Sequence, residues 1–536
     1  MKIQLQSQIT QRNITTFYNT ELFVNSLFIL MLLSTLLVRL IIFFQYSCEI
    51  IDTDQPVMWL AAEDYAHGLF YEPRYYGQDY NTHMESLFAV PLLWLSVPVY
   101  YAVPIATHFI FIFPYIFTAV YLFFNQRKIH ALLTLSIVLC MPAAYDLLNS
   151  LPRGFVTGGF FTSFFVINML YPNRLNVIAL NSIMAVLGFF VNPGSVLASL
   201  PFLFFIFLHN YKNLNYYVVS LLCAALLFPF HLLFDKFYTD HPDYVGLELD
   251  QSFSLHNFVK SISHLDSLFA QVSFFVEKNC LPLLASLLFF VVYLYLKNKK
   301  GFYAFIIFIC LLLLSFFMSK TTQGSPWLFG ALSRLYLAVP FVLCLFGVLI
   351  SIRRRSVFLI LFLIPVVFGV YKTLNYKKLL AWHFNPKNGW GAAVMPLKGT
   401  LEAIEYYKHV CEKNNVNFLM TSGRFWLGNE LAYGGPAIYA DYPETLLANA
   451  ERRYTAREKN KDKVIERFVF ISMHYDFDKM LTMKQDFKIQ RLDDYGLYLI
   501  TENKLKTSSF TNLVTNVEVY HRQSTVISPL DLHNAQ

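Results

Sequence analysis

The sequence predicts a polytopic α-helical membrane protein that carries a small extracytoplasmic α/β domain at its C-terminal end. Of its 536 residues, 56% are hydrophobic and only 14% are charged, whereas a soluble protein needs about a quarter charged residues to cover its surface. The apolar residues form long runs, and the charges between these runs alternate in sign along the chain. The seven cysteines form no C-x-x-C pair. The composition therefore excludes a soluble enzyme, a disordered chain and a disulfide scaffold.

The first apolar run extends from Leu22 to Phe44. It is too long for the core of a signal peptide, so we expect a retained membrane helix. The segment 87–103 is broken by prolines and is expected to lead into the second crossing. With about 20 residues needed for each crossing, the chain has about eleven predicted membrane helices. Besides the first run, the predicted membrane helices lie at 104–124, 131–148, 155–171, 175–191, 195–209, 216–234, 281–296, 302–318, 335–350 and 356–371.

The loops between these runs predict the orientation in the membrane. One set is short and basic, and the alternate set is acidic, above all in segments 52–85 and 235–250. Loops rich in Lys and Arg stay in the cytoplasm, so the N-terminus is expected inside and the C-terminal domain in the periplasm of a bacterial inner membrane. The net charge of +7 follows this topology, and no nucleic-acid partner is expected. The basic loops hold Arg127, Lys128, Arg174, Lys212, Lys297, Lys299, Lys300, Arg353, Arg354 and Arg355.

The composition becomes that of a soluble protein towards the C-terminal end. We expect a membrane core over 1–371, a linker over 372–384 and a soluble domain over 385–536. Residues 401–413 have the pattern of an amphipathic helix, and 416–420, 468–473 and 495–501 have the pattern of buried strands. The charged segment 452–467 is expected to be a solvated helix or loop. These elements predict a small α/β domain.

Two long outer loops could hold a functional site, at 45–86 and at 235–279. The first combines acids, two histidines and a dense set of aromatic residues directly after a membrane helix. Two interpretations fit this composition equally well. The loop is either an aromatic belt with solvated acids or a site beside a lipid headgroup. The second loop is expected to cover the cavity and to admit the acceptor or the lipid.

The motifs of the first loop resemble a known superfamily. An acidic pair after the first helix is followed by G-L-F-Y-E-P at 68–73 and Y-Y-G-Q-D-Y at 75–80. This arrangement resembles the C-type glycosyltransferases (GT-C), which include the protein O-mannosyltransferases and the aminoarabinose transferase that acts on lipid A. The motifs cover 51–93, and the layout of core and outer domain covers the whole chain. The resemblance implies a glycosyltransferase that moves a sugar from a polyprenyl-phosphate donor to a cell-envelope acceptor on the periplasmic face.

The resemblance also implies which carboxylates act. In that superfamily an Asp of the first loop activates the acceptor or orients the donor phosphate, and Asp54 is the match here. Many relatives have Asp-Glu where this chain has Asp54-Gln55, so Asp52 is the nearest candidate for a second acid. Asp79 is expected to orient the acceptor. Carboxylates suit this task because transfer to a hydroxyl or an amine needs a general base.

The donor phosphate calls for cations on the outer side of the membrane, where Arg can bind two oxygens at once. Four cations lie there against the usual charge bias, namely Arg74, Arg153, Lys320 and Arg334. An ordinary ion pair is the alternative interpretation for each. Glu85, Tyr80 and Trp59 are expected to line the acceptor cavity. Arg39 lies inside the first membrane helix and is expected to form a structural pair within the bundle.

Other classes of function remain open at the sequence level. Asp54 and Asp79 could bind a Mg²⁺ ion with water, but His67 and His83 have no metal-ligand spacing, and the sequence assigns no metal and no cofactor. An O-antigen polymerase or ligase would be expected to carry its catalytic loop late in the chain. A transporter or flippase would show polar residues in mid-membrane, whereas these helices look apolar apart from Arg39. The Asp-Gln pair also leaves a non-catalytic scaffold open.

Overall fold

A computed structural model of the chain describes residues 21–78, 80–152, 157–244, 252–276, 279–319, 334–352, 359–383, 394–422, 427–448, 464–471, 488–492 and 497–506. The chain divides into two compact units. The first comprises Met1–Gln45, Thr107–Leu233 and Leu249–Leu379, and the second comprises Tyr46–Ala106, Phe234–Glu248 and Leu380–Gln536.

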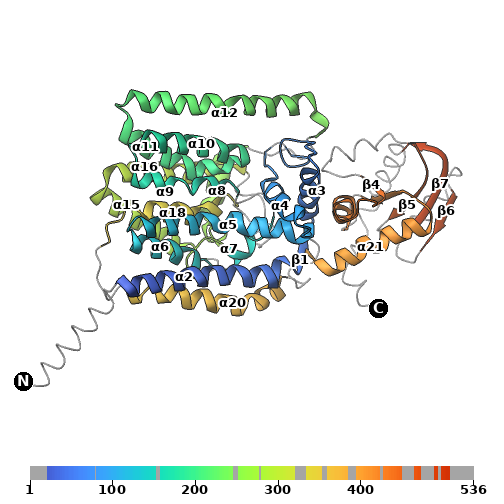
Figure 1. Cartoon of the computed structure of the whole chain (residues 1–536), viewed down its shortest axis with the longest axis horizontal. Coiled ribbons are helices and arrows are strands. Elements are labelled where there is room, and N and C mark those ends of the chain that lie inside the picture. The colour runs from blue at the N-terminus through green and yellow to red at the C-terminus, as the bar shows by residue number, and fades with distance from the viewer. Residues whose placement is uncertain are drawn as a thin grey trace, which may run out of the picture. The chain divides into compact units, whose positions relative to one another are not determined.

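The first unit is built from helices that lie side by side (Figure 1). Every apolar run predicted to cross the membrane contains helix. Three helices have residues in both units: α5 (Val99–Phe124), α12 (Leu214–Asp240) and α20 (Leu363–His383). The main helices within the first unit are α2 (Glu21–Ile42), α6 (Lys128–Leu139), α7 (Ala143–Leu148), α8 (Thr157–Thr162), α9 (Phe165–Leu170), α10 (Leu175–Val191), α11 (Val196–Asn210), α13 (Leu255–Ser263), α14 (Leu265–Leu268), α15 (Leu281–Lys297), α16 (Lys299–Ser315) and α18 (Val339–Gly347).

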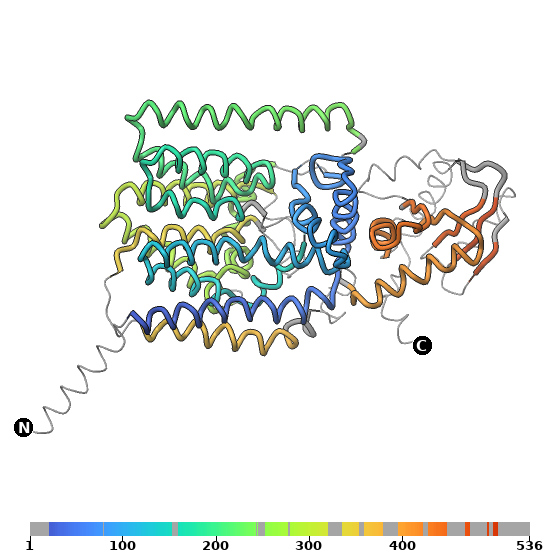
Figure 2. Tube along the Cα trace, viewed as in Figure 1, coloured from blue at the N-terminus to red at the C-terminus, as the bar shows by residue number. Residues whose placement is uncertain are grey.

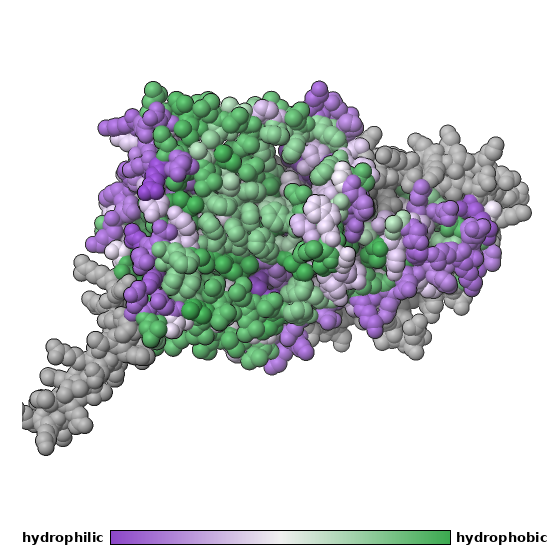
Figure 3. Space-filling model, viewed as in Figure 1, coloured by the Kyte–Doolittle hydropathy of each residue, from purple (hydrophilic) through white to green (hydrophobic). Residues whose placement is uncertain are grey.

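The outer surface of these helices is apolar. Figure 3 shows hydrophobic residues over the helices of the first unit, and Leu221 and Leu226 of α12 are 69% and 71% exposed. Such a surface is unfavourable in water and suits contact with lipid. Among the described residues, the helical segments Glu21–Ser47, Val99–Phe124, Pro193–Asn210 and Leu214–Asp240 are long and apolar enough to cross a bilayer, and several shorter helices are apolar as well. The chain is therefore a polytopic membrane protein.

Helix breaks in the first unit follow from local sequence. The run predicted at 131–148 is divided into α6 and α7, and Pro142 stands before α7 in an extended conformation. Proline has no N–H for the helical ladder and disfavours helix in the residue before it. Asn192 forms the turn between α10 and α11, where its side-chain oxygen accepts a hydrogen bond from the Gly194 N–H at 2.8 Å.

Helices from opposite ends of the sequence meet in the first unit. Figure 2 shows α20 beside α2, and a Cβ placed on Gly369 would lie 3.7 Å from the Val38 side chain. The α2 helix also packs on α6. The first and last membrane helices therefore share one core with α6.

The second unit contains most of the first loop (45–86) and the C-terminal segment. Its helices are α3 (Gln55–Ala66), α4 (Met84–Trp94), α21 (Leu397–Lys413) and α22 (Gly435–Ile438), with one π-helical turn, η6 (Glu430–Gly434). The strand β1 (Ile50–Asp52) pairs antiparallel with β2 (Val394–Pro396). A five-stranded sheet has the order β4-β3-β5-β7-β6, in which β3 is parallel to β4 and β5. Its strands are β3 (Phe418–Ser422), β4 (Glu444–Ala448), β5 (Val464–Ile471), β6 (Lys488–Arg491) and β7 (Leu497–Lys506).

The C-terminal elements can be compared with those predicted. The predicted helix and three strands correspond to α21, β3, β5 and β7, although α21 begins earlier, at Leu397. The sequence did not predict β4 or β6, which are short strands at the two edges of the sheet. Most of the charged segment 452–467 lies outside the described residues. The domain boundaries at 371 and 385 stay a prediction.

Candidate functional site

The site predicted in the first loop begins where β1 turns into α3. Asp52 is buried, and its Oδ1 accepts hydrogen bonds from the backbone N–H of Asp54 at 3.0 Å and of Gln55 at 3.2 Å. The first turn of α3 contains Pro56, which lacks the N–H that would otherwise need a partner. Asp52 therefore satisfies free N–H groups at the start of α3, as a capping residue does.

Asp54 occupies the N-cap position of α3. It is partly exposed, and its backbone oxygen accepts a hydrogen bond from the Tyr75 hydroxyl at 3.0 Å. The dipole of a helix favours negative charge at its N-terminus. The fold thus holds a partly accessible carboxylate at the N-terminus of a short helix.

The rest of the first loop folds around His83. Burial lowers the pKa of His83 to about 3, so the ring is neutral at neutral pH. Its Nε2 accepts a hydrogen bond from the Tyr76 N–H at 2.8 Å, and the ring stacks on Tyr75 at 4.4 Å. Gly77 has a φ of +80°, which glycine adopts without strain, and its N–H donates to Glu72 Oε2 at 3.3 Å. His83 and Glu72 therefore organise the loop.

The predicted cavity residues of this unit differ in their surroundings. Trp59 of α3 is fully buried and contacts Tyr100 edge to face, with 6.2 Å between the ring centroids. Trp59 therefore packs in the core. Glu85 is fully buried in the first turn of α4, whereas Tyr80 is partly exposed. The helices α3 and α4 are joined by a hydrogen bond from the Ser86 hydroxyl to the Met58 backbone oxygen at 2.8 Å. Glu85 thus directly precedes the residue that joins α4 to the first half of α3.

The predicted phosphate-binding cations are only partly described. Arg74 contacts Asp235, with 3.6 Å between its Nη2 and the carboxylate Oδ1, and its backbone N–H donates to the Tyr238 hydroxyl at 3.2 Å. This geometry corresponds to the ion-pair alternative for Arg74. Arg334 begins a short helical turn, η4 (Arg334–Ala338), but its side chain is not described. Asp79, Arg153 and Lys320 lie outside the described residues.

Glu430 of η6 is a buried acid that the sequence did not predict as a site residue. Its side chain is fully buried, and neither carboxylate oxygen has a hydrogen-bond partner within the part of the chain that the structure describes. The preceding residue reaches the first loop, because Asn429 Nδ2 donates to the Thr53 backbone oxygen at 2.9 Å. Burial, together with the charges of Asp52 and Asp54, raises the pKa of Glu430 to about 8. In the sequence, the only indication of a buried acid here was that Glu430 directly precedes the apolar Leu431.

The first unit holds a buried cluster of charges. Asp146 Oδ2 lies 2.6 Å from Lys372 Nζ and accepts a hydrogen bond from the Tyr376 hydroxyl at 2.9 Å. Arg39 Nη1 lies 3.5 Å from Asp146 Oδ1, and the guanidinium stacks over the Phe111 ring at 4.3 Å. The structural pair expected for Arg39 is confirmed.

The expectation that the helices are apolar apart from Arg39 is wrong. Asp146 and Lys372 are both buried in the bundle. Asp146 was overlooked because its apolar neighbours dominate the average over the run at 131–148. Lys372 stands one residue beyond the predicted end of the last helix, whereas α20 continues past it.

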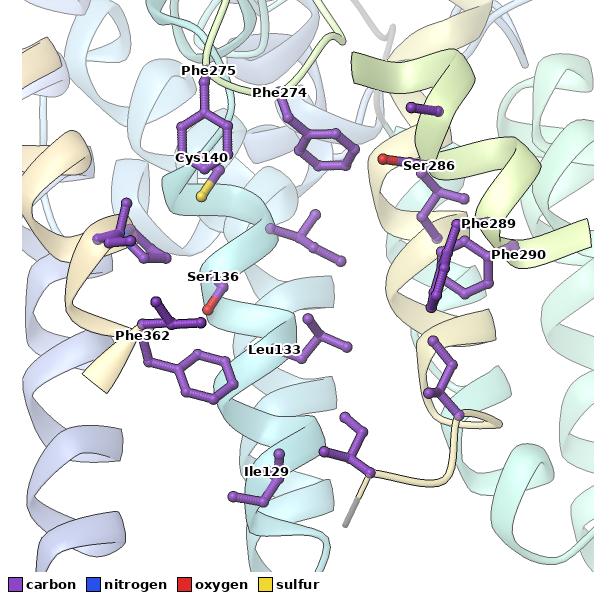
Figure 4. Close-up of a pocket in the computed structure, with 18 of the residues that line it drawn as sticks. Ile129, Leu133, Ser136, Cys140, Phe274, Phe275, Ser286, Phe289, Phe290 and Phe362 are labelled. Atoms are coloured by element: carbon purple, nitrogen blue, oxygen red, sulfur yellow. The ribbon is translucent and has the colours of Figure 1, made fainter. Parts of the chain in front are cut away.

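The first unit also contains an apolar cavity of about 720 Å³. Figure 4 shows Ile129, Leu133 and Ser136 along one side of α6 and Cys140 directly after it, with Phe289 and Phe290 of α15 across the cavity from them. Nearly all the lining atoms are carbon, and the volume lies within the range of about 300–1,000 Å³ for small-molecule pockets. This cavity can accept a hydrocarbon chain.

A metal site was left open by the sequence. Among the described residues, no group of three or more His, Cys, Asp or Glu side chains is arranged to hold a metal ion. Asp79, one of the two acids considered for Mg²⁺, lies outside that part of the chain. The Mg²⁺ hypothesis is therefore untested.

Comparison with solved structures relates this architecture to that of a known enzyme. The apo crystal structure of ArnT from Cupriavidus metallidurans matches 88% of this chain and 97% of its own, with a TM-score of 0.53 and 11% sequence identity. The chain therefore shares the fold of ArnT. ArnT is a GT-C lipid A aminoarabinose transferase, so the fold that the sequence resemblance implied is confirmed. No protein-family model matches the sequence, and no curated protein is similar enough in sequence to count as a relative.

Two substitutions of Asp52 distinguish a structural role, as the cap of α3, from a direct role in sugar transfer. Asp52→Asn is expected to keep normal stability and activity, because the amide oxygen can still accept both N–H groups. Asp52→Ala removes that acceptor and is expected to destabilise the protein by about 0.5–2 kcal/mol. Thermal unfolding and sugar transfer by the two purified variants check this. A well-folded but inactive Asn variant would instead give Asp52 a direct part in the reaction.

Proposed function

We propose that this protein is an integral-membrane glycosyltransferase that transfers a sugar from a polyprenyl-phosphate donor to a cell-envelope acceptor on the periplasmic face. The observation that carries the proposal is the position of Asp54, a partly exposed carboxylate at the N-terminus of α3, in a chain with a GT-C-like fold. Transfer to a hydroxyl or an amine needs a general base, and a partly exposed carboxylate can serve as one.

In the proposed reaction, Asp54 takes the proton from the acceptor hydroxyl or amine. The acceptor atom then forms a bond to the anomeric carbon of the sugar, and the bond from that carbon to the phosphate oxygen breaks. The electron pair leaves with polyprenyl phosphate, whose added negative charge needs cations nearby. Arg153, Lys320 and Arg334 are the proposed cations, with Arg74 as a further candidate through its pair with Asp235.

The proposed membrane topology agrees with such a donor. We propose about eleven crossings in a bacterial inner membrane, a cytoplasmic N-terminus and a periplasmic C-terminal segment. Nucleotide sugars are absent from the periplasm, so a lipid-linked sugar is the available substrate there. Reporter tags in 45–86 and at the C-terminus test the topology, and a cytoplasmic first loop would contradict it.

The apolar cavity beside α6 supports a lipid-linked donor. Its lining can surround part of a polyprenyl chain and exclude water from it. A chain held in this way contributes binding energy away from the reacting sugar.

A second prediction tests this assignment. Ser136 is buried, lines the cavity and donates only to the Leu132 backbone oxygen of its own helix. Ser136→Trp is expected to fill part of the cavity and to raise the KM for a long-chain polyprenyl donor by about tenfold, the loss of some 1.4 kcal/mol of binding. A short-chain donor should be used as well as by the wild type. Ser220→Trp on the lipid-exposed α12 is the control, and an equal effect on both donors would reject the cavity as the lipid site.

The function itself is tested by reconstitution. Purified protein in proteoliposomes is given a radiolabelled polyprenyl-phosphate sugar together with envelope material from a deletion strain. We expect label to pass to an envelope acceptor, and no transfer from a nucleotide sugar. A flippase would instead move the labelled lipid between leaflets without releasing the sugar, and that result would overturn the proposal.

A further inference from the structure

The π-helical turn η6 packs directly on the first loop. A Cβ placed on Gly434 would lie 3.5 Å from Pro56 and 3.5 Å from Trp59, both on α3. The backbone of η6 at Gly434 therefore lies against the first turns of α3. The same turn contacts α21, α22 and β4.

The start of this turn is tied to the corner that carries Asp54. The hydrogen bond from Asn429 Nδ2 reaches the backbone oxygen of Thr53, the residue between Asp52 and Asp54. Glu430 follows Asn429 directly in the chain and is fully buried. The Asn429 side chain thus reaches the corner that carries Asp54, and Glu430 is the next residue along η6.

The Glu430 carboxyl has surroundings that favour its neutral form. No hydrogen-bond partner for it exists among the described residues, and burial of an unpaired carboxylate is strongly unfavourable. The charges of Asp52 and Asp54 oppose a further negative charge, and with burial they raise the pKa of Glu430 to about 8. Glu430 is therefore mostly protonated at neutral pH.

Asp52 and Asp54 are the charged groups that act on Glu430 among the described residues. The other elements packed against η6 also carry ionisable groups, except α22, which has none. These groups are Glu63 and Asp64 on α3, Glu444 on β4, and Lys398, Glu402, Glu405, Lys408, His409, Glu412 and Lys413 on α21.

We propose that Glu430 is a positioning residue for Asp54, held as a neutral acid so that η6 packs on the β1–α3 corner, and that its ionisation limits the reaction at alkaline pH. The part that concerns Asp54 rests on the proposed glycosyltransferase function. Ionised Glu430 adds a negative charge beside two others and separates η6 from α3. The turn that carries Asp54 then loses its support from Asn429.

The packing role is tested by stability, without any assay of transfer. A buried acid with a raised pKa stabilises the fold below its ordinary pKa of 4.5, and this contribution is lost as pH rises towards about 8. The wild-type Tm should therefore fall between pH 5 and pH 9 by more than that of Glu430→Gln, which stays neutral throughout. Glu405→Gln, an exposed acid on α21, is the control and should follow the wild type. An identical pH dependence of wild type and Glu430→Gln would overturn the proposal.

The pH profile of transfer tests the positioning role. Wild-type kcat/KM is expected to fall about tenfold between pH 7 and pH 9, because the protonated fraction of a group with a pKa near 8 falls by that factor. Glu430→Gln should be active at pH 7 and should lose most of this decline. A well-folded Glu430→Gln protein that is inactive at every pH, or that keeps the full decline, overturns the positioning role. A wild type without any transfer activity counts against the proposed function, while the stability result still decides the packing role.

Discussion

Asp54→Asn is expected to lower the rate of sugar transfer by about 10²–10⁴-fold, the range for loss of a general base. The amide has nearly the same shape as the carboxylate, but it cannot take a proton from the acceptor. Asp54 lies at the N-cap of α3 without a side-chain capping hydrogen bond there, since Asp52 makes those contacts. Stability should change little, because Asn suits an N-cap position about as well as Asp does. The measurement is transfer by equal amounts of folded protein in proteoliposomes.

A matched control is available in the same unit. Asp240→Asn changes an exposed acid at the end of α12 and is expected to leave the rate unchanged. If Asp54→Asn kept the wild-type rate, Asp54 would have no role as the base. If its KM for acceptor rose while kcat stayed constant, Asp54 would bind the acceptor without activating it.

The membrane class and the positions of the helices could be predicted because hydropathy is a local property of the sequence. A bilayer demands a long apolar run at each crossing, so α2, α5 and α12 are evident without any knowledge of packing. Short motifs in the first loop also carried the resemblance to GT-C enzymes, although the chain is only 11% identical to ArnT. Those motifs include Gly77, whose positive φ restricts the residues that fit there.

The partners of the polar residues could not be predicted in the same way. The sequence shows that Asp52 and Asp54 are acids, but only the backbone geometry shows that Asp52 caps α3. Glu430 and Thr53 are far apart in the sequence, so nothing local indicates that η6 packs on the first loop. Strands β1 and β2 pair over a similar separation. Such contacts depend on the tertiary fold rather than on local pattern.

The partners of the buried charges in the first unit could not be predicted from local pattern either. Removal of one of these charges is expected to have a large effect on stability. Asp146→Leu is expected to destabilise the protein by about 3–5 kcal/mol, because it leaves Arg39 and Lys372 as unpaired cations in the bundle. The measured effect should be a large loss of folded protein from the membrane and a lower Tm in detergent. Asp146→Asn keeps an acceptor for the Tyr376 hydroxyl and should be less severe.

A compensating variant separates a structural role from a functional one. The triple variant Arg39→Met, Asp146→Leu, Lys372→Met removes both cations together with their carboxylate, and replacement of a whole buried ion cluster by apolar residues is often neutral. It is therefore expected to recover most of the folded protein lost in Asp146→Leu. If it folds and transfers sugar, the cluster only joins α2, α7 and α20. If it folds but is inactive, the cluster takes part in the reaction, and the structural interpretation of Arg39 is wrong.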